Sequence, residues 1–174
     1  MTSMSRHTPA PRAANAKPQT FEDFFDEHQR SLFHAMWLVT RDRSEAEELS
    51  QDAFLRVWER WDRVRTMDDP GAYLYRAAMN LARNRWRRAA TALRRGTRLS
   101  PPRDDMGAVD DRDAVVRTLG GLTPRERAAV VLTHYVGLSS EEAAVAMHVS
   151  ASTVRVLSTR GRAKVRRETG DDDA

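Results

Sequence analysis

Apolar residues recur every three or four positions along most of the chain, a spacing typical of helices that pack through one face. The first periodic segment covers residues 20–40, and Thr20 with Asp23 has the spacing of a capping box at its start. This pattern predicts a helix of about twenty residues. Its apolar face consists of Phe21, Phe24, Phe25, His28, Leu32, Met36 and Val39.

A second amphipathic segment covers residues 44–61, with Ser44 and Glu47 spaced as a capping box. One side of this predicted helix is acidic, and Leu55 is exposed among the acids. An acidic face is usually only solvated, but an exposed leucine within it indicates a docking surface for a basic protein partner. The acids are Glu45, Glu48, Asp52 and Glu59, and the expected buried residues are Ala46, Ala53, Phe54, Val57 and Trp61.

The strongest chemical signal lies in residues 69–88, a predicted helix with Asp69 as N-cap and Pro70 in its first turn. One face carries a line of cations bordered by aromatic rings, and the opposite face is apolar. Arginine neutralises phosphate and rings stack on unpaired bases, so this face suits a nucleic-acid strand that is not fully duplex. A merely solvated arginine-rich face is the alternative. The line is Arg76, Asn80, Arg83 and Arg87, flanked by Tyr73 on one side and by Met79 and Trp86 on the other; Leu74, Ala77, Ala78 and Leu81 lie opposite.

Several sequence signals for the start of a helix occur close together after residue 114. A short apolar helix over residues 114–122 precedes a capped helix that Gly137 ends. A short helix ending near Met147, a three-residue turn and a last helix to about Arg167 then follow in the order of a helix-turn-helix. The N-terminal caps are Thr123 with Glu126, Ser139 with Glu142, and Ser150.

The last predicted helix has an apolar inner face and a polar outer face. Early side chains of the outer face would reach base edges in a DNA major groove, and later arginines would reach phosphates. The alternative is a terminal amphipathic helix in a small bundle. The inner residues are Val154, Leu157, Gly161 and Val165, and the candidates for DNA contact are Ser152, Thr153, Arg155, Thr159, Arg162 and Arg166.

These elements predict an all-α protein made of two small helical domains joined by a flexible linker. The N-terminal domain covers residues 20–88 with three helices, and the helix-turn-helix domain covers residues 114–168. Residues 89–113 combine Gly, Ser and consecutive prolines and form the expected linker. Residues 1–19 lack the apolar run of a signal peptide and are expected to be a disordered tail, and residues 169–174 form an acidic tail.

Charge is distributed unevenly, although the formal net charge is only +4. Basic runs over residues 83–98 and 155–167 favour a polyanionic partner. No long apolar segment accompanies them, so nucleic acid is favoured over a membrane and no membrane insertion is expected. The chain has no cysteine, which removes disulfides and thiolate metal sites and fits a reducing cytoplasm.

Signatures of enzymes are missing from the sequence. It contains no phosphate-binding loop, no dinucleotide fingerprint, no zinc-protease motif and no nucleophile elbow. Its five histidines are scattered, and His28, His34 and His134 fit core or surface positions better than metal sites. We therefore expect no catalytic residue, metal, cofactor or small-molecule substrate.

Two stretches of the sequence together resemble the extracytoplasmic-function sigma factors of bacterial RNA polymerase. The family's second-region pattern is similar to SEAEELSQDAFLRVWERW followed by DPGAYLYRAAMNLARNRWRR. Its fourth-region pattern is similar to LTPRERAAVVLTHYVGLSSEEAAVAMHVSASTVRVLSTRGRAKVR. The resemblance covers nearly everything from Phe21 to Arg167, and both halves in this order are strongly specific.

The resemblance implies a sigma factor that binds core RNA polymerase and directs initiation at specific promoters. The first domain would bind the polymerase and hold the opened minus-ten element, and the last helix would read the minus-35 element as duplex. A separate anti-sigma protein as regulator is inferred from the family alone. Implied polymerase contacts are Glu48, Gln51, Asp52 and Arg56, beside the exposed Leu55; implied minus-ten contacts are the connector 62–69 with Asp62 and Arg63, then Tyr73, Arg76, Asn80, Arg83 and Arg87.

Several positions depart from the family pattern. His148 occupies a turn position where the family usually has glycine, so it must adopt a left-handed conformation or change the turn. Ala143 and Ala146 replace larger aliphatic residues, which predicts a thin core under the last helix. Leu157 and Ser158 stand where arginine and leucine are more usual. These departures put recognition of the minus-35 element in question, and none of them lies in the first domain.

Two other classes of protein fit parts of this pattern. One is a helix-turn-helix transcriptional regulator that is not a polymerase subunit and binds duplex DNA alone. The other is a polymerase adaptor or sigma-binding protein that never contacts promoter DNA, which would tolerate neutralisation of Arg155 and Arg162. Neither the promoters nor an inducing signal can be identified from the sequence.

Overall fold

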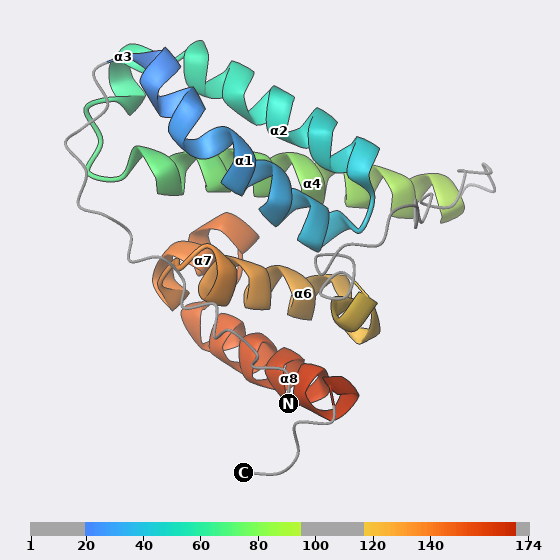
Figure 1. Cartoon of the computed structure of the whole chain (residues 1–174). Helices are drawn as coiled ribbons and strands as arrows, with labels where there is room; N and C mark the ends of the chain where they lie inside the picture. The colour runs from blue at the N-terminus through green and yellow to red at the C-terminus, as the bar shows by residue number, and fades with distance from the viewer. Residues whose placement is uncertain (1–19, 95–116, 170–174) are drawn as a thin grey trace, which may run out of the picture.

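The computed structural model describes residues 20–94 and 117–169, and within these ranges all regular structure is helical, as expected (Figure 1). The predicted tail at 1–19, linker residues 95–113 and tail residues 170–174 lie outside the described residues.

Helices α1 and α2 begin at capping side chains. The Thr20 hydroxyl accepts from the backbone N–H of Asp23 at 3.1 Å, which confirms the predicted start of α1, Phe21–Thr40. Helix α2 covers Arg43–Trp58, and its N-cap is Asp42, whose carboxylate accepts from the Glu45 N–H at 2.8 Å. The predicted Ser44 cap is therefore wrong. Asp42 has the extended backbone that an N-cap needs, and Ser44 lies inside the first turn.

The connector after α2 contains a helix that was not predicted from the sequence. Helix α3, Trp61–Val64, is a single turn, too short to show an apolar period. Helix α4, Pro70–Arg94, begins as predicted, because Asp69 Oδ1 accepts from the Ala72 N–H at 2.7 Å. It continues past the predicted end at residue 88 because the following residues, AATALR, are mostly good helix formers.

The core between α1, α2 and α4 agrees with most of the predicted apolar faces. On α4, Leu74 and Ala78 are fully buried, while Ala77 and Leu81 are only half-buried. Met79, which was expected to flank the basic line, is buried too. The inner face of α4 is therefore rotated toward Met79. Other fully buried side chains in this part are Phe24, Leu32, Met36, Val39, Leu49, Val57 and Val64.

In the described part of the predicted 114–122 helix, residues 117 and 118 are helical and lead into the short helix η1, Leu119–Gly121. Residues 114–116 lie outside the described residues. Helix α6, Pro124–Val130, continues into a π-helical stretch η2, Val131–Tyr135. Helix α7 covers Ser140–Met147 and α8 covers Ala151–Thr169. The predicted caps are confirmed: complete capping boxes at Thr123 and Ser139, and the Ser150 hydroxyl accepting from the Thr153 N–H at 3.1 Å.

The turn between α7 and α8 has the conformation predicted for its unusual residue. His148 lies in the left-handed region, with φ 54° and ψ 49°. A non-glycine residue there costs on the order of 1–2 kcal/mol, so the surrounding packing must hold the turn in place.

The two halves pack on each other (Figure 1). Helix α7 lies against α4, α6 and η2 lie against α1, and α8 lies on the far side of α6 and α7. At this junction the buried Arg127 donates from Nε to the Val39 carbonyl at 2.7 Å. Burial, with a smaller contribution from the Arg41 charge, lowers the pKa of Arg127 to about 10, so it stays charged at neutral pH. The sequence did not predict this packing.

Gly161 allows α8 to approach α6 closely. A Cβ at this position would lie 2.6 Å from Cγ2 of Val130, a stiff β-branched side chain. Gly161→Ala should improve helix propensity by about 1 kcal/mol but cost about 1–3 kcal/mol in overpacking. We expect a net loss of stability of about 1 kcal/mol in urea unfolding followed by circular dichroism. The exposed Arg160→Ala on the same helix serves as control, and a stabilised G161A variant would contradict the predicted clash.

Candidate functional site

The predicted basic line on α4 is present as one stripe. The guanidinium carbon of Arg76 lies 5.5 Å from the ring centre of Tyr73, a cation–π contact that holds both side chains. Arg83 donates to Asn80 Oδ1 at 3.4 Å. Arg87 is exposed, and the other four are half-buried. The structure thus brings Tyr73, Arg76, Asn80, Arg83 and Arg87 together along one helix.

The middle of this α4 stripe is in contact with the second half of the protein. Asn80 Oδ1 lies 2.7 Å from His148 Nε2, at the end of α7. The hydrogen bond occupies the same amide oxygen that Arg83 approaches. No sequence signal pointed to this pairing, because the two residues are far apart in the chain and on separate predicted domains.

Asp62 and Arg63, the predicted connector contacts, lie on α3 and are exposed. Helix α3 lies at the end of the molecule where α4 begins (Figure 1). The Asp62 carboxylate lies 3.5 Å from Nε of Arg65, one turn later. Asp62 is almost fully exposed, so this ion pair is weak and leaves the carboxylate accessible.

The acidic face of α2 is partly neutralised by an arginine of the neighbouring helix α4. Arg85 of α4 reaches across to Glu48 at 2.7 Å and to Asp52 at 4.0 Å. The neighbouring Glu45 has its pKa raised by burial, against the opposing effect of the Arg85 charge. Sequence reasoning placed Arg85 only in a basic run and did not find this link between the two helices. Glu48, Gln51, Asp52, Leu55 and Arg56 are all exposed on one face of α2.

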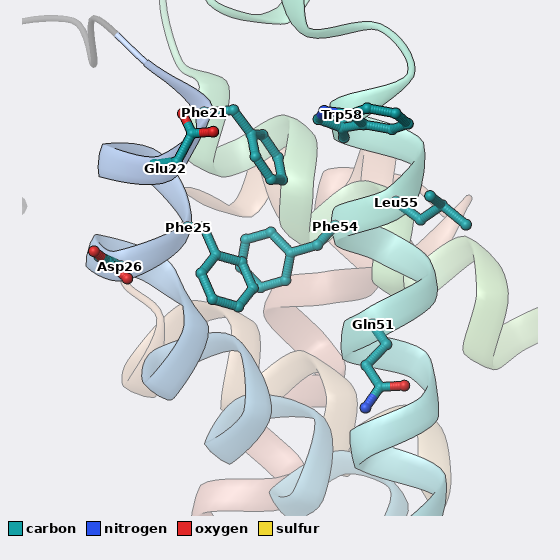
Figure 2. Close-up of a pocket in the computed structure, with 8 residues that line it drawn as sticks. All are labelled: Phe21, Glu22, Phe25, Asp26, Gln51, Phe54, Leu55 and Trp58. Carbon is teal, nitrogen blue, oxygen red and sulfur yellow. The ribbon is translucent and has the colours of Figure 1, made fainter.

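An apolar groove of about 640 Å³ lies between the start of α1 and the second half of α2 (Figure 2). Its floor includes Phe25 and Phe54, whose ring centres are 4.7 Å apart. Leu55 and Trp58 project beside it with 52% and 60% of their surface exposed. The sequence reading found Leu55 but missed Trp58, although the spacing of Gln51, Leu55 and Trp58 follows one helical line. The groove is lined by Phe21, Glu22, Phe25, Asp26, Gln51, Phe54, Leu55 and Trp58.

The outer face of α8 carries the predicted polar side chains. Those of Ser152, Thr153, Arg155, Thr159, Arg162 and Arg166 are all exposed. Arg155 Nη1 lies 3.3 Å from Glu141 Oε1 on α7, an exposed pair that DNA could displace at little cost. The hydroxyls of Ser152 and Thr153 each lie 2.8 Å from the Ser150 hydroxyl, so the cap also orders the first turn.

The inner face of α8 explains one departure from the family pattern. Ser158 is buried, and its hydroxyl lies 3.2 Å from Thr133 Oγ1 and 2.9 Å from His134 Nε2. A polar residue in place of leucine is therefore paired rather than isolated. Burial, followed by the charge of Arg162, lowers the pKa of His134, which favours the neutral ring at this contact.

A second polar contact fixes α8 against α6. The buried Glu126 accepts from Lys164 Nζ at 2.7 Å while it completes the Thr123 capping box. The hydrogen bond from Lys164 is the largest of the causes that lower the pKa of Glu126. These bonds set the rotation of α8, which determines the side chains that face outward.

Within residues 20–94 and 117–169, no group of three or more metal-ligating side chains is found. The same part of the chain holds no helix long and apolar enough to span a membrane.

Comparison with known protein families assigns both halves of the chain. Residues 24–91 match the family described as Sigma-70 region 2, and residues 112–165 match Sigma-70, region 4. The first match contains α2, α3 and most of α4, and the second contains the helix-turn-helix. The two matches, in this order, define a sigma factor of the sigma-70 family.

Comparison with individual relatives assigns the chain to one group within this family. It is 32% identical over 151 residues to an RNA polymerase sigma-E factor of Streptomyces coelicolor, with 85% of each chain covered. It is 28% identical to the ECF RNA polymerase sigma factor SigK of Mycobacterium ulcerans, with 82% of this chain and 81% of the relative covered. The chain therefore belongs to the extracytoplasmic-function (ECF) sigma factors, as its sequence motifs predicted. This family acts in transcription initiation and is not a family of enzymes.

Solved structures with a similar fold include two complexes. The sigma factor RpoE bound to the anti-sigma factor NepR of Bartonella quintana has a TM-score of 0.69 at 21% identity, with 87% of this chain and 99% of that chain covered. CnrH bound to the cytosolic domain of CnrY has a TM-score of 0.58 at 26% identity, with 88% and 89% covered. The likeness to RpoE at this identity concerns the fold.

Proposed function

We propose that this sigma factor binds core RNA polymerase and directs transcription initiation by reading the minus-35 element as duplex and the minus-ten element as an opened strand. The observation that carries the proposal is that one chain presents two basic stripes of different chemistry, on α4 and on α8. The α4 stripe includes an aromatic ring, which suits unpaired bases. The α8 stripe lies on the second helix of a helix-turn-helix, which suits a duplex.

The proposed polymerase contact is the groove between α1 and α2 together with the exposed face of α2. Leu55 and Trp58 offer apolar surface that water now covers, and Glu22 and Asp26 add acidic charge at its side. An apolar centre with a charged rim is the usual composition of a protein interface. A segment with apolar and basic side chains would complement this surface.

The proposed minus-ten contact is the α4 stripe with the neighbouring Asp62 and Arg63. Tyr73 can stack on an unpaired base, and Arg76 and Arg83 can neutralise adjacent phosphates. Stacking on an aromatic side chain contributes about 1–3 kcal/mol per base, enough to favour an opened strand over the closed duplex locally. Control by a separate anti-sigma protein, which the family resemblance implies, also belongs to the proposal.

Run-off transcription tests the proposal directly. Purified core polymerase with this chain should initiate at a specific start site on a promoter selected from genomic fragments, and core polymerase alone should not. Absence of specific initiation across the genomic fragments would refute the proposal. Tight binding to duplex DNA without polymerase would favour the regulator, and polymerase binding without promoter contact would favour the adaptor.

The α8 stripe makes a testable distinction between two arginines. Arg155, in the first turns, can reach guanine edges, so Arg155→Ala should cost about 1–3 kcal/mol on the preferred minus-35 sequence and much less on a scrambled one. Arg162, farther along, should contact phosphate, so Arg162→Ala should weaken both sequences alike and make the salt slope shallower by about one unit. Binding of the holoenzyme to both DNAs at several salt concentrations measures these effects.

A matched control for Arg155 is its ion-pair partner on α7. Glu141→Gln removes the negative charge of this ion pair but leaves the arginine in place, so it should preserve the preference for the correct sequence. If Arg155→Ala left the ratio between the preferred and scrambled sequences unchanged, α8 would not be reading bases through this residue.

A further inference from the structure

Val156 is an apolar residue on the otherwise polar outer face of α8. It is 47% exposed, whereas Val154 on the same helix is fully buried, and Leu157 and Val165 are half-buried. Its exposure means that it adds little to the core, and a β-branched residue is not favoured by helix propensity. The side chain is therefore accessible to a partner outside the folded monomer.

Helical spacing places Val156 among the side chains proposed to contact DNA. Ser152 lies one turn before it and Thr159 lies one turn after it, so all three share one side of α8. Arg155 borders the same surface. The valine methyl groups thus lie within the surface that would face the major groove. One hydroxyl side chain lies a turn before them and the other a turn after them.

The chemistry of the major groove limits what such a side chain can recognise. Valine has no hydrogen-bonding group, so it can neither hold a phosphate nor pair with a donor or acceptor on a base edge. The one apolar group that natural bases present in the major groove is the C5 methyl of thymine, which small apolar side chains contact.

We propose that Val156 is a specificity-determining residue that packs against the C5 methyl of a thymine in the minus-35 duplex. The inference rests on the proposed function, because it requires α8 to lie in the major groove. The thymine should lie close to the guanine that Arg155 is proposed to read, because the two residues are adjacent on α8 and their Cα atoms are about 3.8 Å apart.

Deoxyuridine provides the sharpest test because it removes the thymine methyl without changing base pairing. Each thymine of the minus-35 element is replaced in turn, and binding of the holoenzyme is measured with the native chain and with Val156→Ala. We expect one position at which deoxyuridine weakens binding of the native holoenzyme by about three- to tenfold. With Val156→Ala the same replacement should have a much smaller effect, because most of the apolar surface that packs against the thymine methyl is removed.

Control variants separate recognition from folding. Val156→Ala is a surface change to a better helix former, and circular dichroism should show unchanged helicity. Val145→Ala removes the other exposed valine of the helix-turn-helix and should retain the native deoxyuridine penalty. A holoenzyme that fails to initiate would overturn the proposed function. An active holoenzyme with equal deoxyuridine penalties for the native and Val156→Ala chains, or with none at any thymine, would overturn the assignment of Val156 alone.

Discussion

Leu55→Asp is expected to weaken binding of the chain to core RNA polymerase by at least tenfold. Leu55 has 52% of its surface exposed beside the groove, and burying a leucine side chain contributes about 1.5–3 kcal/mol. The new carboxylate would also have to lose water in an apolar contact beside existing acids, which adds to the loss. Titration of labelled chain with core polymerase, without DNA, measures the change in affinity.

The control variant adds the same charge outside the groove. Ala90 is exposed near the end of α4, so Ala90→Asp changes the net charge equally and should bind core polymerase normally. Charge reversal at Asp52 would be a less selective test, because Asp52 lies 4.0 Å from Arg85 and a new cation there would also disturb the packing of α4 on α2. Unchanged affinity of Leu55→Asp would exclude this face of α2 as the polymerase contact.

Helices that carry both a cap and an apolar period were predictable from the sequence. The starts at Thr20, Asp69, Thr123, Ser139 and Ser150 are correct because each cap uses only neighbours within three residues. The start of α2 was misplaced because Asp42 and Ser44 are both good caps, and residue type and spacing alone do not select between them. Helix α3 was missed because one turn has no period.

Contacts between distant residues limited the prediction of the site. Outward faces on α4 and α8 follow from periodicity, so the candidate stripes could be found in advance. The ion pairs of Arg85 and the hydrogen bond between Asn80 and His148 join residues on different helices, and periodicity says nothing about them. The groove itself was not predicted, because Leu55 and Gln51 lie on α2 whereas Phe21 and Phe25 come from α1.

The packed arrangement of the two halves conflicts with simultaneous contact to both promoter elements. The minus-35 and minus-ten elements are separated by roughly 25 base pairs, or about 85 Å at 3.4 Å per base pair. Helix α4 itself is only about 38 Å long at 1.5 Å per residue, and α7 lies directly against it. The halves must therefore separate if α4 and α8 are to reach their proposed targets together.

Holding α7 on α4 is therefore expected to reduce promoter opening at least tenfold. The native chain has no cysteine, so Asn80→Cys with His148→Cys creates a single reactive pair where the native side chains lie 2.7 Å apart. A short, reducible bis-methanethiosulfonate would link the pair before polymerase is added. Permanganate reactivity of the promoter thymines should be lost in the linked protein, because α7 still covers the α4 stripe and α8 cannot reach its element.

Reduction of the link provides the internal comparison, since the same doubly substituted protein is then measured with its halves free to separate. Any effect of losing Asn80 or His148 is present in both states and cancels. The single His148→Cys chain treated with the same reagent controls for modification of one thiol. Recovery of thymine reactivity after reduction would show that separation of α4 and α7 precedes opening. Equal reactivity in the linked and reduced states would mean that the α4 stripe engages the strand while α7 remains packed against it.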